Sequence, residues 1–296
     1  MAATRTLLPG RRWHFQHGPI DCVIGAEGDA HAVEAAHEAA WRRFVPLLGE
    51  LAAELPRLRQ PVGRECPLEG PVARRMWQAC APFRDRFITP MAAVAGAVAQ
   101  ELIVAYRRAS VVRAFVNNGG DIALHLAPGA SLRVGLFSDL KRLDARALAD
   151  GLTIDGRFEI AHTMPVRGIA TSGWRGRSFS LGIADSVTVL AASAAMADAA
   201  ATVIANAVDL DDARIVRRPA CELQDDSDLG TILVTVEVPE LGAAAVRRAL
   251  EAGLAVARDL QARGLIEACA LACQGVMLAT SMQQPLGCIP PEAIAA

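Results

Sequence analysis

Two side chains able to bind a metal ion lie one helical turn apart in the segment Met196 to Val208. Asp198 offers a carboxylate and Thr202 a hydroxyl. The segment is rich in alanine, which favours a helix, and residues four apart share one helix face. Such oxygen donors suit Mg²⁺, whose remaining positions are filled by water or phosphate. The alternative is that Asp198 is a first-turn acid favoured by the helix dipole and that Thr202 is packed.

A buried strand is predicted directly before this helix. The residues from Ser186 to Ala191 are β-branched or apolar throughout. A continuous apolar run of this length is typical of a strand in a sheet core. We therefore expect a strand, a short turn and then the helix that carries Asp198.

A second group of candidate residues separates two strands predicted within residues 111–126. It consists of Asn117, Asn118, Gly119, Gly120 and Asp121. Asn118-Gly119 is a strong hairpin signal, because type I′ turns need positive φ. These residues can therefore form only a turn, or their backbone amides and asparagine side chains can contact a ligand. The residue types do not decide between the two.

A third group lies in the glycine-rich segment from Gly168 to Ser180. Thr171, Ser172 and Gly173 are followed by Arg175 and Arg177. Glycine backbone with hydroxyls and arginine suits phosphate. The segment has neither a P-loop ending nor GxGxxG spacing, and Ser172 lacks the GxSxG context of a hydrolase nucleophile. An ordinary hairpin loop with solvated arginines is the alternative.

The remaining pattern predicts helices mixed with strands. Asp29 is the expected cap of a helix over residues 30–55, on which His31 and His37 are expected to be solvated, because no acid or cysteine completes a metal pattern. Thr89 and Pro90 are predicted to begin a helix over residues 91–106. Its first half has almost no large side chains, so it can pack tightly on another helix or lie against a flat ligand. Residues 267–280 read as one final buried strand.

Composition excludes several classes of protein. The chain has 296 residues, of which 52% are hydrophobic, and a formal net charge of −2, so no basic surface for nucleic acid is expected. No segment has the length of a membrane span, and no apolar run of a signal peptide precedes Arg11. The 7 cysteines are scattered without a CxxC motif, which predicts reduced thiols and a cytoplasmic location. The oligomeric state stays open, with a homo-oligomer as one alternative.

Five blocks in this order resemble the uncharacterised cytosolic branch of the ApbE superfamily. They are PMAAVAGAVA at 90–99, VNNGGDIAL at 116–124, GIATSG at 168–173, GRSFSLGIADSVTVLA at 176–191 and ADAAAT at 197–202. The founding members are FAD:protein FMN transferases. The resemblance, strongest over residues 88–208, implies one ApbE-like domain over residues 1–296. It implies an α/β (α+β) fold with an antiparallel β-sheet and flanking helices.

The resemblance also assigns roles by position. It places Mg²⁺ ligands at Asp198 and Thr202, with a backbone carbonyl near Ala95 as a further ligand. It places residues 117–121 beside a flavin nucleotide, FAD or FMN, and makes Thr171, Ser172 and Gly173 another wall of that pocket. No catalytic residue is assigned.

One departure from the family pattern bears on activity. The transferases carry a His-x-x-Asp-Pro-x-Thr-Gly block after the ATSG-like loop, whereas residues 174–185 here contain neither histidine nor proline. The expected function is a Mg²⁺-dependent flavin-nucleotide-binding protein, with FAD processing or a transferase-like reaction open. The alternatives are a non-catalytic flavin-binding protein and a factor in sulfide or homocysteine assimilation that acts through a cysteine.

Overall fold

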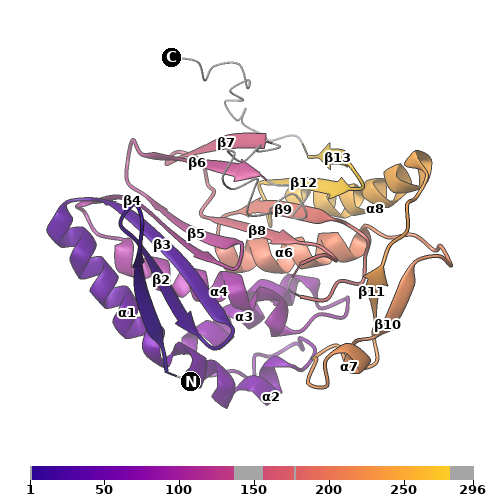
Figure 1. Cartoon of the computed structure of the whole chain (residues 1–296), viewed down its shortest axis with the longest axis horizontal. Coiled ribbons are helices and arrows are strands. Elements are labelled where there is room, and N and C mark those ends of the chain that lie inside the picture. The colour runs from indigo at the N-terminus through magenta and orange to yellow at the C-terminus, as the bar shows by residue number, and fades with distance from the viewer. Residues whose placement is uncertain (1, 137–155, 177, 281–296) are drawn as a thin grey trace.

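The computed structural model describes residues 2–136, 156–176 and 178–280, and a nine-stranded antiparallel sheet forms the centre of this part (Figure 1). The strand order is β1-β2-β3-β4-β5-β8-β9-β12-β13. These strands are β1 (Thr4–Leu8), β2 (Arg12–His17), β3 (Ile20–Gly28), β4 (Val111–Asn118), β5 (Asp121–Leu126), β8 (Gly168–Ser172), β9 (Ser186–Ala191), β12 (Ala268–Cys273) and β13 (Val276–Ala279). Every neighbouring pair in the sheet is antiparallel.

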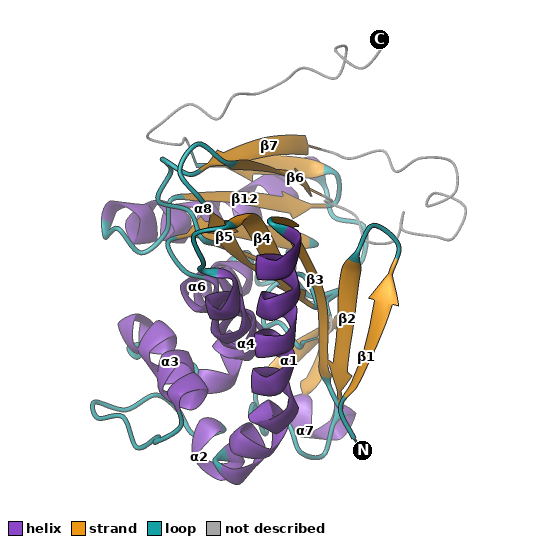
Figure 2. Ribbon diagram, turned by 90° about the vertical axis from the view of Figure 1, so that its left-hand side faces the viewer, coloured by secondary structure: helices purple, strands orange, loops and turns teal. Residues whose placement is uncertain are grey.

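Helices gather on one side of this sheet and enclose the main hydrophobic core between them and the strands (Figure 2). The longer ones are α1 (Ala30–Ala53), α3 (Pro71–Cys80), α4 (Val94–Leu102), α6 (Ala194–Ala207) and α8 (Ala243–Ala262). The short ones are α2 (Leu55–Leu58), α7 (Ala220–Leu223) and the 3₁₀ turns η1 (Ala81–Phe83), η2 (Pro90–Ala93) and η3 (Ile103–Tyr106). The predicted α+β fold, an antiparallel sheet with flanking helices, is thus confirmed. Among the described helices, none combines the length and apolarity that crossing a bilayer needs.

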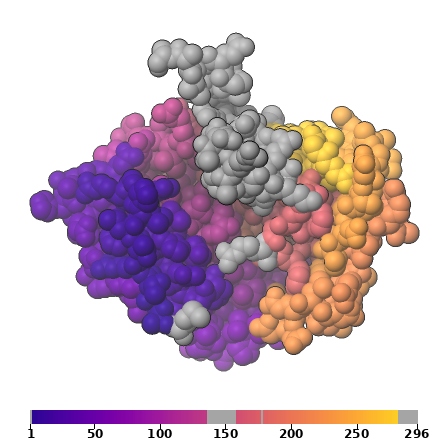
Figure 3. Space-filling model, in the orientation of Figure 1, coloured from indigo at the N-terminus to yellow at the C-terminus, as the bar shows by residue number. Residues whose placement is uncertain are grey.

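Two hairpins stand apart from the main sheet. Strands β6 (Ser131–Leu136) and β7 (Gly156–Ala161) pair with each other, and so do β10 (Val216–Pro219) and β11 (Leu233–Glu237). The β6–β7 hairpin closes a second, smaller core that includes Leu124 and Ile160. In the space-filling view, the N-terminal part (indigo) and the last third (orange to yellow) lie on opposite sides of the molecule (Figure 3).

Several local predictions agree with the structure. Strand β9 has the bounds predicted for it. The Asp29 side chain accepts a hydrogen bond from the Ala32 amide at 2.9 Å, and α1 begins at the next residue. Pro46 lies inside α1, which continues through it as one element.

Three local predictions are wrong. The expected helix over residues 91–106 is three pieces, η2, α4 and η3, and the Thr89 hydroxyl donates to Asp228 instead of capping η2. The expected final strand is the hairpin β12–β13, with Gln274 at φ 45° in its turn. The turn between β4 and β5 is Gly119-Gly120, because Asn118 and Asp121 already pair across the strands. Both glycines have positive φ, at 65° and 115°.

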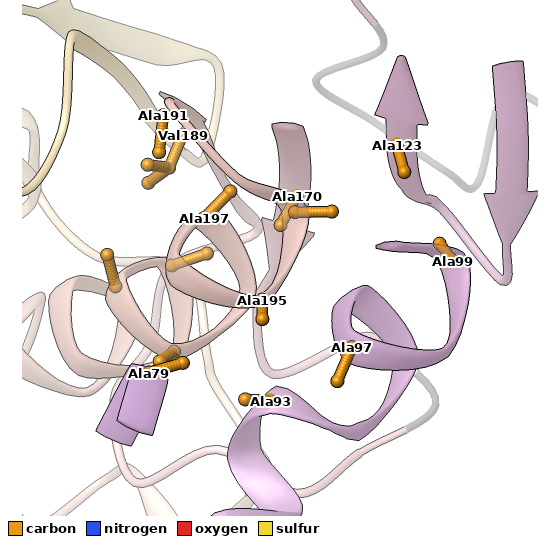
Figure 4. Packing of buried hydrophobic residues seen from close by; sticks show 14 of the residues in the cluster. Ala79, Ala93, Ala97, Ala99, Ala123, Ala170, Val189, Ala191, Ala195 and Ala197 are labelled. Atoms are coloured by element: carbon orange, nitrogen blue, oxygen red, sulfur yellow. The ribbon is translucent and has the colours of Figure 1, made fainter. Parts of the chain in front are cut away.

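The close contact between α4 and α6 depends on small residues. Ala97 and Ala99 of α4 lie near Ala195 and Ala197 of α6 in a packed group of alanines (Figure 4). At Gly96 there is no room for any side chain, because a Cβ there would lie 2.3 Å from the Ala194 carbonyl oxygen. Of the two readings of this small-residue segment, tight helix packing therefore applies to α4.

We predict that Gly96→Ala destabilises the protein, since α4 and α6 must separate to admit the methyl group. Overpacking of a tight core contact costs about 1–3 kcal/mol of unfolding free energy. The matched control is Gly49→Ala in α1, where a Cβ meets nothing within 4 Å. That change should stabilise the protein by about 0.4–1 kcal/mol. Urea denaturation measures both, and equal effects of the two changes would contradict the packing account.

Candidate functional site

A cavity of about 330 Å³ opens between the sheet and the helices, and segments distant in the sequence line it. The β2–β3 turn, η2 with α4, the β4–β5 turn, the loop after β8 and α6 all contribute. The lining residues are Pro19, Ile20, Met91, Val94, Ala95, Val98, Asn118, Gly119, Thr171, Ser172, Gly173, Gly176, Ser178, Asp198 and Thr202. Small-molecule sites in proteins range from about 300 to 1,000 Å³, so this cavity has the size of a ligand site.

Most of the residues singled out in the sequence meet in this cavity. Those that line it are Ala95, Asn118, Gly119, Thr171, Ser172, Gly173, Asp198 and Thr202. Asn117, Gly120 and Asp121 do not line it. Asn117 accepts a hydrogen bond from the Gly120 amide at 2.8 Å and so supports the turn, and Asp121 lies buried beside the cavity.

Helix α6 presents Asp198 and Thr202 to the cavity from one face. Ser193 caps the helix, with its hydroxyl accepting from the Met196 amide at 3.3 Å. The Asp198 carboxylate accepts a hydrogen bond from the Gly96 amide of α4 at 2.9 Å. Ala95, which precedes Gly96 in α4, lines the same cavity.

Asn118 joins three of the segments that form the cavity. Its Nδ2 donates to the Ala95 carbonyl at 3.1 Å, and its Oδ1 accepts from the Asp21 amide at 3.3 Å. The side chain is 6% exposed, so both bonds are protected from water. Asn118 thus holds the β4–β5 turn against α4 and against the β2–β3 hairpin.

Two carboxyl groups meet next to the cavity. Asp121 and Asp198 lie within hydrogen-bonding reach of each other, and the Thr171 amide donates to Asp121 at 3.2 Å. Burial raises the pKa of Asp121 to about 7. Asp198 keeps some exposure through the cavity, yet desolvation by the surrounding protein and the charge of Asp121 raise its pKa well above the usual value. Such a pair is stable when it shares a proton or when a cation neutralises it.

The donors around Asp198 are of a kind that fits Mg²⁺. Asp198 supplies a carboxylate, Thr202 a hydroxyl and Ala95 a backbone carbonyl, all on one cavity. These are hard oxygen donors, and Mg²⁺ usually binds through few carboxylates plus water and phosphate. Within the described ranges, no three His, Cys, Asp or Glu residues come together as a metal cluster.

Arg175, a candidate for phosphate binding, is committed elsewhere. Its Nε lies 3.0 Å from Asp185 Oδ1, and its guanidinium lies over the Trp174 ring. Asp185 also accepts from the Gln274 amide. The reading of Arg175 as a solvated loop arginine is wrong, since the ion pair fixes the loop that carries Gly173 and Gly176. Arg177 lies outside the described residues.

Other lining residues had no signal in the sequence. Pro19 and Ile20 come from the β2–β3 turn, which looked like an ordinary hairpin. Their place in the cavity follows from the pairing of β3 with β4, a long-range contact that local patterns do not encode. Met91, Val94 and Val98 belong to the small-residue block, but nothing showed which of its side chains face a ligand.

The fold and the cavity define an α+β protein with a ligand-sized cavity between an antiparallel sheet and its helices. A model of the family described as "AbpE bacteria" matches residues 5–279, and the chain belongs to this family. The resemblance to the ApbE superfamily drawn from the five blocks is thereby confirmed.

Relatives with similar sequences are archaeal proteins named UPF0280. One from Methanopyrus kandleri is 40% identical over 157 residues, which cover 52% of this chain and 56% of the relative. One from Methanothrix thermoacetophila is 37% identical, covering 48% of this chain and 54% of the relative. The chain thus spans about half the length of these two relatives. One from Methanosarcina acetivorans is 34% identical over 202 residues, which cover 67% of this chain and 72% of the relative.

Two solved structures show a distant similarity. The ApbE protein of Thermotoga maritima has a TM-score of 0.35 and 15% identity, covering 86% of this chain and 77% of its own. The apo flavinyl transferase ApbE of Pseudomonas stutzeri has a TM-score of 0.41 and 12% identity, covering 95% of this chain and 94% of its own. TM-scores this low do not define equivalent residues.

We predict that Asn118→Asp destabilises the fold, because a carboxylate oxygen would then face the Ala95 carbonyl where an N–H now donates. Leaving a buried group without its partner costs about 1–3 kcal/mol. Asn117→Asp is the control, since its Oδ1 keeps the bond from Gly120. It should change the unfolding free energy by less than about 0.5 kcal/mol. The two midpoints in urea give the comparison, and a larger loss in the control would refute the role given to Asn118.

Proposed function

We propose that the chain binds a flavin nucleotide, FAD or FMN, in this cavity together with Mg²⁺. Asp198, Thr202 and the Ala95 carbonyl would hold the metal. The observation that supports the proposal is that Ala95, Asp198 and Thr202 line one ligand-sized cavity. Membership in the ApbE-like family supports it, because the resemblance implies the same metal and nucleotide.

Electrostatics supports a cation at Asp198. Neither Asp121 nor Asp198 has a Lys or Arg partner among the described ion pairs. An uncompensated pair of carboxylates in a desolvated place is costly. Mg²⁺ beside Asp198 would neutralise the pair and lower the pKa values that burial now raises. The oxygen donors and the uncompensated negative charge of the two aspartates thus both favour Mg²⁺.

The lining of the cavity suits a nucleotide with a flat ring. Pro19, Ile20, Met91, Val94 and Val98 are apolar and offer a surface for a ring. The polar residues are Asn118, Thr171, Ser172, Ser178 and Thr202, together with the glycine backbone at 119, 173 and 176. Ligand sites commonly combine an apolar surface with a few polar groups that fix orientation. Hydroxyls and exposed amides can donate to phosphate oxygens.

Whether the bound nucleotide reacts depends on the metal ion and on the acid–base groups that the cavity offers. Mg²⁺ would neutralise the pyrophosphate of FAD and stabilise charge that develops on it. Among the described lining residues, Asp198 is the one ionisable side chain, and it would be a metal ligand. We therefore expect binding or slow pyrophosphate cleavage, not efficient FMN transfer. A non-catalytic flavin-binding protein is the second candidate, favoured by the same scarcity of acid–base groups.

The cysteines give little support to a sulfur-transfer role. Burial raises the pKa of Cys22, Cys80, Cys269 and Cys273, so their thiols are poor nucleophiles. All six described cysteines are free thiols, which suits a reducing compartment, and we keep the cytoplasm as the proposed location. We also keep one domain over residues 1–296 as a proposal, supported by the continuous sheet from β1 to β13.

We predict that Asp198→Asn abolishes Mg²⁺-dependent FAD binding while the fold persists, because Asn keeps an acceptor for the Gly96 amide but loses the charge. Thr202→Val, which removes a hydroxyl at equal size, should weaken binding about tenfold or more. Calorimetric titration of FAD with Mg²⁺ and with EDTA measures both.

The matched control for this titration is Asp211→Asn, which removes an exposed carboxylate outside the cavity. It should bind FAD as the unchanged protein does. Binding that is the same in Asp198→Asn, with or without Mg²⁺, would rule out this metal site.

We further predict that the protein does not transfer FMN efficiently to a protein threonine. Residues 174–185 lack the His-x-x-Asp-Pro-x-Thr-Gly block, and losing one group that stabilises a transition state commonly costs about a hundredfold or more. The test is incubation with FAD, Mg²⁺ and a flavinylation-acceptor domain, followed by mass spectrometry of the acceptor. A stoichiometric gain of one FMN on the acceptor threonine would restore the transferase function.

A further inference from the structure

A second cavity, of about 390 Å³, lies between the β1–β2 hairpin, the end of β3 and the first turns of α1. The residues of its lining that matter here are Leu7, Arg11, Trp13, Val33, Glu34 and His37. It is separate from the proposed nucleotide cavity. Ile20 lines the first and Ala26 the second, six residues apart along β3, which corresponds to about 20 Å of strand.

His37 lies at the base of this second cavity and is not the solvated histidine expected from the sequence. His37 is 4% exposed, and its Nδ1 lies 2.7 Å from the Tyr106 hydroxyl. Burial lowers the pKa of His37, so the imidazole is neutral at pH 7. His31, on the same helix, is exposed as expected.

The hydrogen bond to Tyr106 decides which nitrogen of His37 carries the proton. Tyr106 is fully buried, and His37 Nδ1 is the one hydrogen-bond partner of its hydroxyl among the described residues. If Nδ1 carried the proton, the buried tyrosine O–H would have no acceptor, which is costly. The tyrosine therefore donates to Nδ1, and the proton of the ring lies on Nε2. Nε2 has no hydrogen-bond partner among the described residues, and His37 is one of the residues that line the cavity.

The positive charge of Arg11 and the negative charge of Glu34 lie in the same cavity as His37. Arg11 and Glu34 both line the cavity, and neither takes part in a salt bridge within the described residues. Both act electrostatically on His37, so both lie near its ring. Glu27, which also lines the cavity, is neutralised by Arg113 at 2.7 Å. The unpaired groups are thus one guanidinium, one carboxylate and one neutral N–H donor.

An apolar wall completes the cavity. Leu7, Trp13 and Val33 contribute to it. The guanidinium of Arg5 lies 5.3 Å from the centre of the Trp13 ring and pairs with Glu38, which holds the indole in place. The cavity therefore joins a fixed aromatic surface to a pair of opposite charges. Among the described residues, no three His, Cys, Asp or Glu side chains come together in this cavity as a metal site.

We propose that this cavity binds a small zwitterion of the free α-amino acid class with an apolar side chain. Glu34 would take the ammonium group, and Arg11 with the Nε2–H of His37 would take the carboxylate. The apolar side chain would lie along Trp13 and Val33. Recognition of both charges excludes simple amines and simple carboxylic acids, which leave one charged group of the cavity without a partner.

The test is titration of the full chain with L-leucine, followed by two-dimensional NMR of the Trp13 indole and the Gly28 amide. Two isosteric probes lack one charge each: 4-methylpentanoate lacks the ammonium group, and 3-methylbutylamine lacks the carboxylate. We expect saturable shifts with L-leucine and binding about tenfold weaker or worse with either analogue. Equal binding of an analogue, or no saturable shift up to about 10 mM L-leucine, would overturn the proposal.

Substitutions at Glu34 and Arg11 give a second test of binding. Both side chains are exposed, so removing their charge should leave the fold intact. Glu34→Gln and Arg11→Gln should each weaken L-leucine binding about tenfold at an unchanged melting temperature. Glu65→Gln, an exposed loop change outside the cavity, is the control and should bind as before. Binding that survives both Glu34→Gln and Arg11→Gln would show that the charges do not recognise the ligand.

Discussion

The first turn of α6 is enclosed so closely that only glycine fits on two sides of it. A Cβ at Gly96 of α4 would lie 2.3 Å from the Ala194 carbonyl oxygen, and one at Gly168 of β8 would lie 2.2 Å from the Ala194 nitrogen. This contact brings the Gly96 amide to the Asp198 carboxylate, and Ala95 next to Gly96 lines the same cavity. The arrangement of oxygen donors in the cavity is therefore a consequence of backbone packing, and a larger residue at either glycine would disperse them.

The same contact explains why a cation is expected there. Asp198 and Asp121 are brought together from α6 and β5 in surroundings that desolvate both. Hydrogen bonds from Gly96 and Thr171 compensate only part of the charge. Groups whose pKa values are strongly perturbed cluster at functional sites, and a cation here would neutralise the two acids. In contrast, a purely structural role would be served better by an Asp–Arg pair, such as Asp185 with Arg175 in the neighbouring loop.

The sequence predicts what is local and misses what is assembled over long distances. The cap at Asp29, the strand from Ser186 to Ala191 and the existence of the β4–β5 hairpin follow from residue types within a few positions, although the turn of that hairpin lies one residue later than expected. The helical segment after Thr89 lies where it was expected but is divided into η2, α4 and η3, and its expected cap Thr89 bonds instead to Asp228, far along the chain. The burial of His37 by Tyr106 and the pairing of Asp121 with Asp198 had no local signal either. The candidate site was found because a family resemblance supplied the long-range information that periodicity lacks.

The most direct measurement is a crystal structure of the protein grown with FAD and Mn²⁺, an ion whose anomalous scattering identifies it in place of Mg²⁺. The account predicts one anomalous peak between the Asp198 carboxylate, the Thr202 hydroxyl and the Ala95 carbonyl, in contact with flavin phosphate in the cavity lined by Asn118 and Ser172. A metal bound elsewhere, or a flavin outside this cavity, would contradict it.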